Sequence, residues 1–176
     1  MPIPGTCKEF YVIYGKDNPN GATPLLYVEV DCSGASPTMT HNGQVYTGCS
    51  GYMDQAFTIS GHWATDNIAF AVSKVYTGTG ATAKRFLLSV SGTGIVRSEI
   101  SSSGISSGSI TASYTALGLT AYTDFSGIEA EISWGSNKFA WSSDNGTVHI
   151  ININSDGQAS IPYTIQNYTI SGAKGI

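Results

Sequence analysis

Short runs of alternating apolar and polar residues, separated by turn residues, recur along most of this 176-residue chain. In residues 128–134 the apolar Ile128, Ala130, Ile132 and Trp134 alternate with polar side chains. A period of two places the apolar side chains on one face of a strand and the polar side chains on the other. Glycine, asparagine, aspartate and serine fill the gaps between such runs, as they do in tight turns.

No segment shows a sustained helical periodicity, so the expected fold class is all-β without significant helix. An antiparallel β-sandwich is the expected architecture, with a barrel as the alternative. The strands are expected at residues 9–14, 25–32, 36–40, 44–49, 56–63, 67–75, 84–91, 95–100, 110–117, 128–134, 138–141, 147–153 and 159–170.

Two of these strands depart from simple alternation. Residues 67–75 carry apolar side chains on both faces, which predicts a central strand of a sheet. In residues 159–170 the apolar phase slips by one residue, which predicts a β-bulge near Gln166 and Asn167.

The length fits one domain, or one domain with a small appendage. A boundary near Gly51 would separate an N-terminal β-hairpin region at residues 1–50 from a main β-sandwich at residues 51–176. One continuous domain is the alternative. Within the first region, Asn42-Gly43 between two β-prone runs predicts a tight hairpin.

Charged residues make up only 11% of the chain, against about 25% in an average soluble domain, and the net charge is -4. A surface of this kind suits extracellular modules, carbohydrate binders and subunits of assemblies. No basic stripe is present to neutralise phosphates, so no nucleic-acid partner is expected. No apolar run approaches the ~20 residues of a membrane helix, so no membrane insertion is expected.

The chain begins Met-Pro-Ile-Pro-Gly-Thr, which has neither the charged region nor the apolar region of a signal peptide. Two accounts are open. Either an export signal has been removed, or the protein is made in the cytosol and leaves by another route, as phage virion proteins do at lysis. The expected location is therefore a virion, with the extracellular space or a cell surface as the alternative.

The three cysteines, Cys7, Cys32 and Cys49, leave at least one free thiol unless two chains pair. No Cys-x-x-Cys spacing is present, so buried thiols with one bridge are expected in place of a metal site. If Tyr14 pairs with Leu25 in a hairpin, Cys7 lies opposite Cys32, and we predict that any disulfide joins these two residues.

Three segments in this region carry a resemblance: Cys-x-Glu-Phe-Tyr at residues 7–11, Tyr-Val-Glu-Val-Asp-Cys-Ser-Gly at residues 27–34, and Val-Tyr-Thr-Gly-Cys at residues 45–49. Their layout resembles short cysteine-bearing β modules in proteins of Bacteroidetes and their phages. The resemblance covers residues 7–49. It implies a β module in a surface or virion protein, and it carries over no catalytic residues.

Candidates for chemistry are few. Glu129 and Glu131 lie on one strand face, about 6–7 Å apart, but they alternate with a core face and are expected in solvent, unlike glycosidase acids in a cleft. Residues 104–108 fit G-x-S-x-G without the helix that a nucleophile elbow requires. Enzymatic activity is therefore not expected.

Oxygen-rich loops at Asp17, Asn20 and Asp144 offer ligands that calcium prefers, although the same residues are ordinary turn formers. Neither loop has a complete calcium-binding pattern. No cofactor is therefore expected, with calcium as the alternative.

Ten tyrosines and three tryptophans stand out in a chain with so few charges. Trp63, Trp134 and Trp141 have two interpretations, core residues or a binding platform, and Trp134 continues the inward face of its strand. Exposed tyrosines suit sugar stacking or a subunit interface, and the candidates are Tyr11, Tyr27, Tyr46 and Tyr122.

The pattern favours a non-enzymatic structural or adhesive protein, such as a decoration, fibre or tail-associated subunit of a phage virion. It would pack against copies of itself or other subunits through low-charge surface and edge strands. A carbohydrate-binding module or lectin is the first alternative. An extracellular filament subunit completed by a strand from its neighbour is the second.

Overall fold

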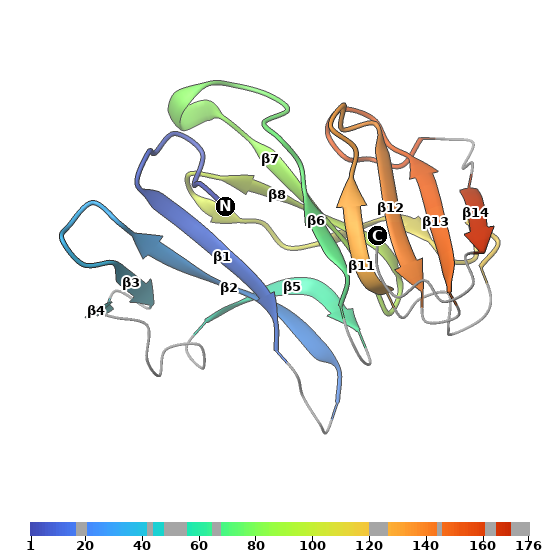
Figure 1. The fold of residues 1–176 in the computed structure, drawn as a ribbon, viewed down its shortest axis with the longest axis horizontal. Helices are drawn as coiled ribbons and strands as arrows, with labels where there is room; N and C mark the ends of the chain where they lie inside the picture. Colours follow the sequence, from blue (N-terminus) through green and yellow to red (C-terminus); the bar gives the residue numbers. More distant parts are fainter. Residues whose placement is uncertain are drawn as a thin grey trace.

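Three antiparallel β-sheets stacked as layers make up the fold (Figure 1). The structure, a computed structural model, describes residues 1–16, 21–41, 44–47, 56–64, 68–119, 127–143, 146–160 and 165–169. Across these ranges the one helical element is a single 3-10 turn at Gly80–Thr82. The all-β antiparallel class is therefore confirmed. No helix of the described ranges has the length and apolar character needed to span a membrane.

The first sheet has the strand order β1-β2-β3-β4. β3 pairs with residues 29–31 of β2, and β5 pairs with residues 23–27 of β2. Because β5 pairs with β2, this sheet contains residues from both sides of position 51. His41 pairs with Gln44, which confirms the hairpin predicted at Asn42-Gly43. The strands are β1 (Glu9–Gly15), β2 (Thr23–Asp31), β3 (Thr38–His41), β4 (Gln44–Thr47) and β5 (Phe57–Ala64).

The second and third sheets follow in chain order. The second has the order β10-β8-β7-β6 with the short β9 beside β8, and the third runs β11-β12-β13-β14. Their strands are β6 (Phe70–Val72), β7 (Arg85–Ser91), β8 (Gly94–Ser101), β9 (Gly104–Ile105), β10 (Ser109–Ser113), β11 (Gly127–Ile132), β12 (Lys138–Ser143), β13 (Thr147–Asn152) and β14 (Ile165–Thr169).

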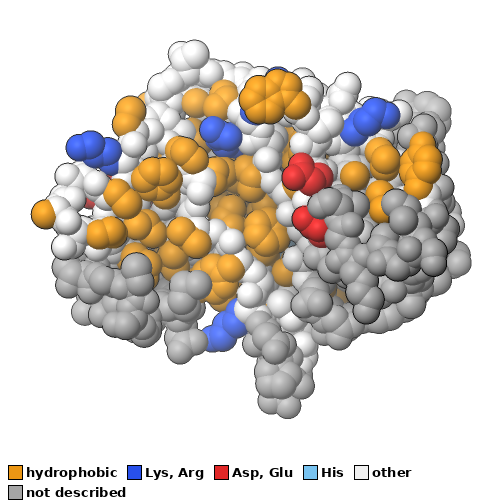
Figure 2. Space-filling view, viewed as in Figure 1, with side chains coloured by type: hydrophobic (Ala, Val, Ile, Leu, Met, Phe, Trp, Pro, Cys, Tyr) orange, Lys and Arg blue, Asp and Glu red, His pale blue; other side chains and the backbone are white. Residues whose placement is uncertain are grey.

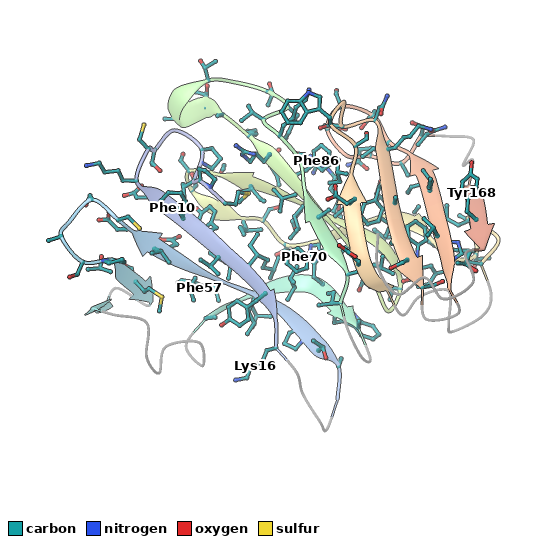
Figure 3. The ribbon with its side chains drawn as sticks, viewed as in Figure 1. Phe10, Lys16, Phe57, Phe70, Phe86 and Tyr168 are labelled. Carbon is teal, nitrogen blue, oxygen red and sulfur yellow. The ribbon has the colours of Figure 1, made fainter. Side chains whose placement is uncertain are left out.

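The second sheet is the middle layer, because β7 is buried on both faces. Phe86 and Leu88 belong to a core cluster shared with Phe139 and Trp141 of the third sheet. Leu87, between them in sequence, belongs to a different cluster with residues of the first sheet. Figure 3 shows the labelled Phe86 between the second and third sheets. A strand between two apolar layers has apolar side chains in succession, without alternation.

The prediction of a central strand at residues 67–75 is wrong. The strand there, β6, has three residues and lies at the edge of the second sheet. Its side chains at Phe70 and Val72 contact the cluster toward the first sheet, and Ala71 contacts the cluster toward the third. Apolar side chains on both faces thus identify the middle layer, but they do not give the position of a strand within that layer.

The register between β1 and β2 corrects the predicted disulfide. Tyr14 pairs with Leu26, one residue away from the expected pairing. The Cys32 N–H donates to the Lys8 carbonyl oxygen at 2.8 Å, so Lys8 lies opposite Cys32. Cys7 and Cys32 are free, exposed thiols. A shift of one residue also turns the paired side chains to opposite faces, which removes the geometry on which the bridge depended.

The bulge predicted near Gln166 and Asn167 is wrong as well. The pairing of β14 with β13 runs without a break from Ile165 to Thr169. The apolar phase that suggested a slip was read partly from residues 161–164, which lie outside the described residues.

The middle layer generates a test of the fold. Leu88 is fully buried, and Leu88→Ala leaves a cavity there, so we expect a loss of about 2–5 kcal/mol in the free energy of unfolding. The matched control is Ile110→Ala on β10, where the side chain is 55% exposed, with an expected change below about 0.5 kcal/mol. Urea unfolding measures both. Equal losses would contradict the three-layer packing.

Candidate interaction surfaces

The first and second sheets are joined along β5 by backbone hydrogen bonds. The Gly92 N–H donates to the Trp63 carbonyl oxygen at 2.8 Å, and the Gly108 N–H donates to the Ser60 carbonyl oxygen at 2.7 Å. The Trp63 ring packs closely on Gly92, where a Cβ would lie 2.1 Å from the ring, so a side chain at this position would displace Trp63. These contacts close one side of the pair of sheets.

A buried histidine reinforces this closed side. The Ser98 hydroxyl donates to the Ser106 carbonyl oxygen at 2.7 Å, so it accepts the N–H of His62 Nε2, 2.8 Å away. His62 Nδ1 then accepts the hydroxyl of Ser89 at 2.6 Å. Desolvation lowers the pKa of His62 to about 4, and the imidazole is neutral. With 1% of its surface exposed, His62 meets no substrate, so the Ser-His pairs here bind the sheets together.

The opposite side presents an unpaired edge on β1. Tyr11 exchanges two backbone hydrogen bonds with Met1, at 2.8 and 2.9 Å, on the side away from β2. Because backbone groups of alternate residues point to opposite sides of a strand, those of Ile13 and Gly15 also point away from β2. Within the described ranges no residue pairs with them.

The facing strand β6 has a similar edge. The Val90 N–H of β7 donates to the Ala69 carbonyl oxygen at 2.9 Å, so the Ala69 backbone points toward β7. The same alternation directs the backbone groups of Phe70 and Val72 away from β7, and no described strand pairs with that side of β6.

Apolar side chains lie between these two edges. Ile13, Phe70 and Val72 are partly buried and pack against the cluster between the first and second sheets. Figure 2 shows hydrophobic side chains gathered in a hollow on this face, and the labelled Phe70 lies on the side of β6 toward β1 (Figure 3). We call the outward backbone of β1 at residues 13 and 15, that of β6 at residues 70 and 72, and the apolar side chains between them the open edge.

The N-terminal residues already occupy the neighbouring part of the β1 edge. The Ile3 N–H donates to the Glu9 carbonyl oxygen at 2.9 Å, and the Ile3 side chain is buried in the same cluster. The chain turns back at Gly5, whose φ of 87° favours glycine. A short extended segment therefore pairs with the β1 edge at residues 9 and 11, and the open edge lies on the same side of β1 at residues 13 and 15.

The predicted aromatic set separates into different roles. Trp141 is fully buried in the core, and Trp63, 36% exposed, packs on Gly92. Trp134 is 88% exposed, so its expected inward position is wrong. Tyr11 is buried, contrary to expectation, and its hydroxyl donates to the Ser101 carbonyl oxygen. Tyr122 lies outside the described residues.

The predicted calcium ligands Asp17, Asn20 and Asp144 also lie outside the described residues. In the part of the chain that the structure describes, no group of three or more metal-ligating side chains is found. Glu129 and Glu131 are both exposed, as expected for the wet face of β11.

An acidic pocket of about 290 Å³ lies beside β1, β2 and β3 and contains Glu9, Glu29 and Asp31. Burial, with a contribution from Glu9, raises the pKa of Glu29. Hydrogen bonds from Ser33 lower the pKa of Asp31. The described residues that line this pocket include no histidine, lysine or arginine, and the nearby Lys8 contributes to the lowered pKa of Asp31.

The chain matches no protein-family model, and searches of the curated proteins and of the solved structures found no match.

The buried His62 predicts a pH-dependent stability. The pKa of His62 is about 6.5 in the unfolded chain and about 4 in the folded chain. The contribution of His62 to stability is therefore fully present above pH 6.5 and is lost as the pH falls from 6.5 to 4. The loss approaches about 3 kcal/mol at pH 4. The difference in unfolding free energy between the wild type and His62→Gln, measured from pH 7 to pH 4, isolates this contribution. Parallel pH profiles would exclude it.

Proposed function

We propose that this protein is a non-enzymatic structural or adhesive subunit that joins further subunits by strand addition at the open edge. The observation that carries the proposal is a pair of strand edges, on β1 and β6, that no described strand pairs with, and the partly buried apolar side chains between them. Unpaired edges are templates for another chain, and β-strand addition uses such edges for recognition.

The energetics favour an extended, apolar segment as the added partner. Its backbone would pair with the outward groups of Ile13 and Gly15, at about 0.5–1.5 kcal/mol for each hydrogen bond formed. Its alternate side chains would cover Phe70 and Val72, at roughly 25 cal/mol for each Å² of apolar surface removed from water. Specificity follows from the apolar side chains, because backbone pairing does not distinguish sequences.

The composition supports a second copy of this chain as the source of that segment. With 11% charged residues, two copies repel each other weakly when they approach. A decoration, fibre or tail-associated component of a phage virion is our specific proposal. An extracellular filament subunit would use the same strand addition in another setting.

Light scattering on the purified protein tests the assembly. We expect the mass of an oligomer, at least twice the 18.4 kDa of one chain. Ile13→Lys, which places a charge beneath the added strand, should shift the protein to the monomer. The matched control is Val12→Lys on the opposite face of the same strand, where the side chain is already 41% exposed, and it should leave the assembly intact.

A second variant guards against misfolding of the first. Val72→Lys places the charge on the other side of the open edge, and a native circular dichroism spectrum with a cooperative thermal transition identifies folded protein. A monomeric wild type, or folded Ile13→Lys and Val72→Lys variants that assemble like the wild type, would contradict strand addition at this edge.

A further inference from the structure

Trp134 is a solvent-exposed residue in the turn that follows β11. β11 stops at Ile132, so the inward-facing alternation carries Trp134 past the edge of the core and into the turn before β12. Its side chain is 88% exposed, the largest fraction of any large hydrophobic residue among those described. The indole is outside the core cluster and is accessible to an external partner.

The turn that carries Trp134 is fixed by one serine. Ser133 Oγ accepts the backbone N–H groups of Asn137 at 3.2 Å and Lys138 at 3.1 Å, and it donates to Asn137 Oδ1 at 2.9 Å. The Ser136 N–H donates to the Ser133 carbonyl oxygen at 2.7 Å. A site on a turn with this many bonds loses little conformational entropy when a ligand binds.

One cation lies over the indole, and further hydrogen-bond donors are on the same turn. The Lys74 ammonium lies 5.7 Å from the ring centroid, and no carboxylate among the described residues pairs with it. The indole N–H and the Asn137 side-chain N–H₂ likewise have no partner within the described chain. The surroundings of Trp134 therefore supply donors and one positive charge.

We propose that Trp134 and Lys74 form a binding site for acidic sugar rings, in which a carboxylate or sulfate is carried on the sugar. The C–H face of the sugar ring stacks on the exposed indole, and its acidic group pairs with the Lys74 ammonium, which lies over the indole ring on a flexible stem. The Asn137 amide and the Lys74 ammonium suit a sugar, because ligand sites combine aromatic surface with a few polar groups that fix orientation. This site does not depend on the open edge.

Affinity electrophoresis in native gels tests the site with the full chain. The gels contain polygalacturonate, heparin or dextran, so the three arms offer carboxylates, sulfates and a neutral polymer. We expect retardation by one or both acidic polymers and much less by dextran. Trp134→Ala should weaken the apparent affinity about tenfold, and Lys74→Gln about threefold with loss of the preference for acidic polymer.

Matched controls separate the site from general effects of surface and charge. Tyr168→Ala removes another exposed aromatic side chain, 52% exposed, and Lys8→Gln removes another exposed positive charge. Both should bind like the wild type. Failure of both acidic polymers to retard the protein, wild-type binding by Trp134→Ala, or equal retardation by dextran would each overturn the proposal. The exposed position of Trp134 makes loss of folding in this variant detectable as a changed thermal transition.

Discussion

Burial of β7 on both faces is the constraint on which the rest of the structure depends. Phe86 and Leu88 require an apolar layer on one side and Leu87 requires another on the opposite side. Because a strand places successive side chains on opposite faces, these neighbours in sequence cannot share one core. The first and third sheets satisfy this requirement, and a chain with few charges folds around a thick apolar interior.

In this stacking the first and second sheets are joined along one side and not along the other. Along β5 the sheets are tied by backbone hydrogen bonds and by His62 between two serine hydroxyls. Between β1 and β6 no described strand bridges them, and the short N-terminal segment covers only part of the gap. A closed side gives the rigidity that an open side needs if a strand from another subunit is to find a preformed site.

Much of the fold could be predicted from the sequence, because its signals are local. The alternation in residues 128–134 identifies β11, and Asn42-Gly43 identifies a hairpin. The open edge could not be predicted, because strand order and register depend on contacts between distant residues. The exposure of Trp134 was missed for a smaller reason: alternation was continued past Ile132, where the strand ends and the turn begins.

Hydrogen exchange of individual backbone amides tests the open edge most directly. In dilute monomer the N–H groups of Ile13, Phe70 and Val72 should exchange quickly, whereas those of Val12 and Ala71, which face neighbouring strands, should be protected. On assembly at high protein concentration, the first three should become protected and the other two should change little. Assembly without any new protection at Ile13, Phe70 and Val72 would contradict the account.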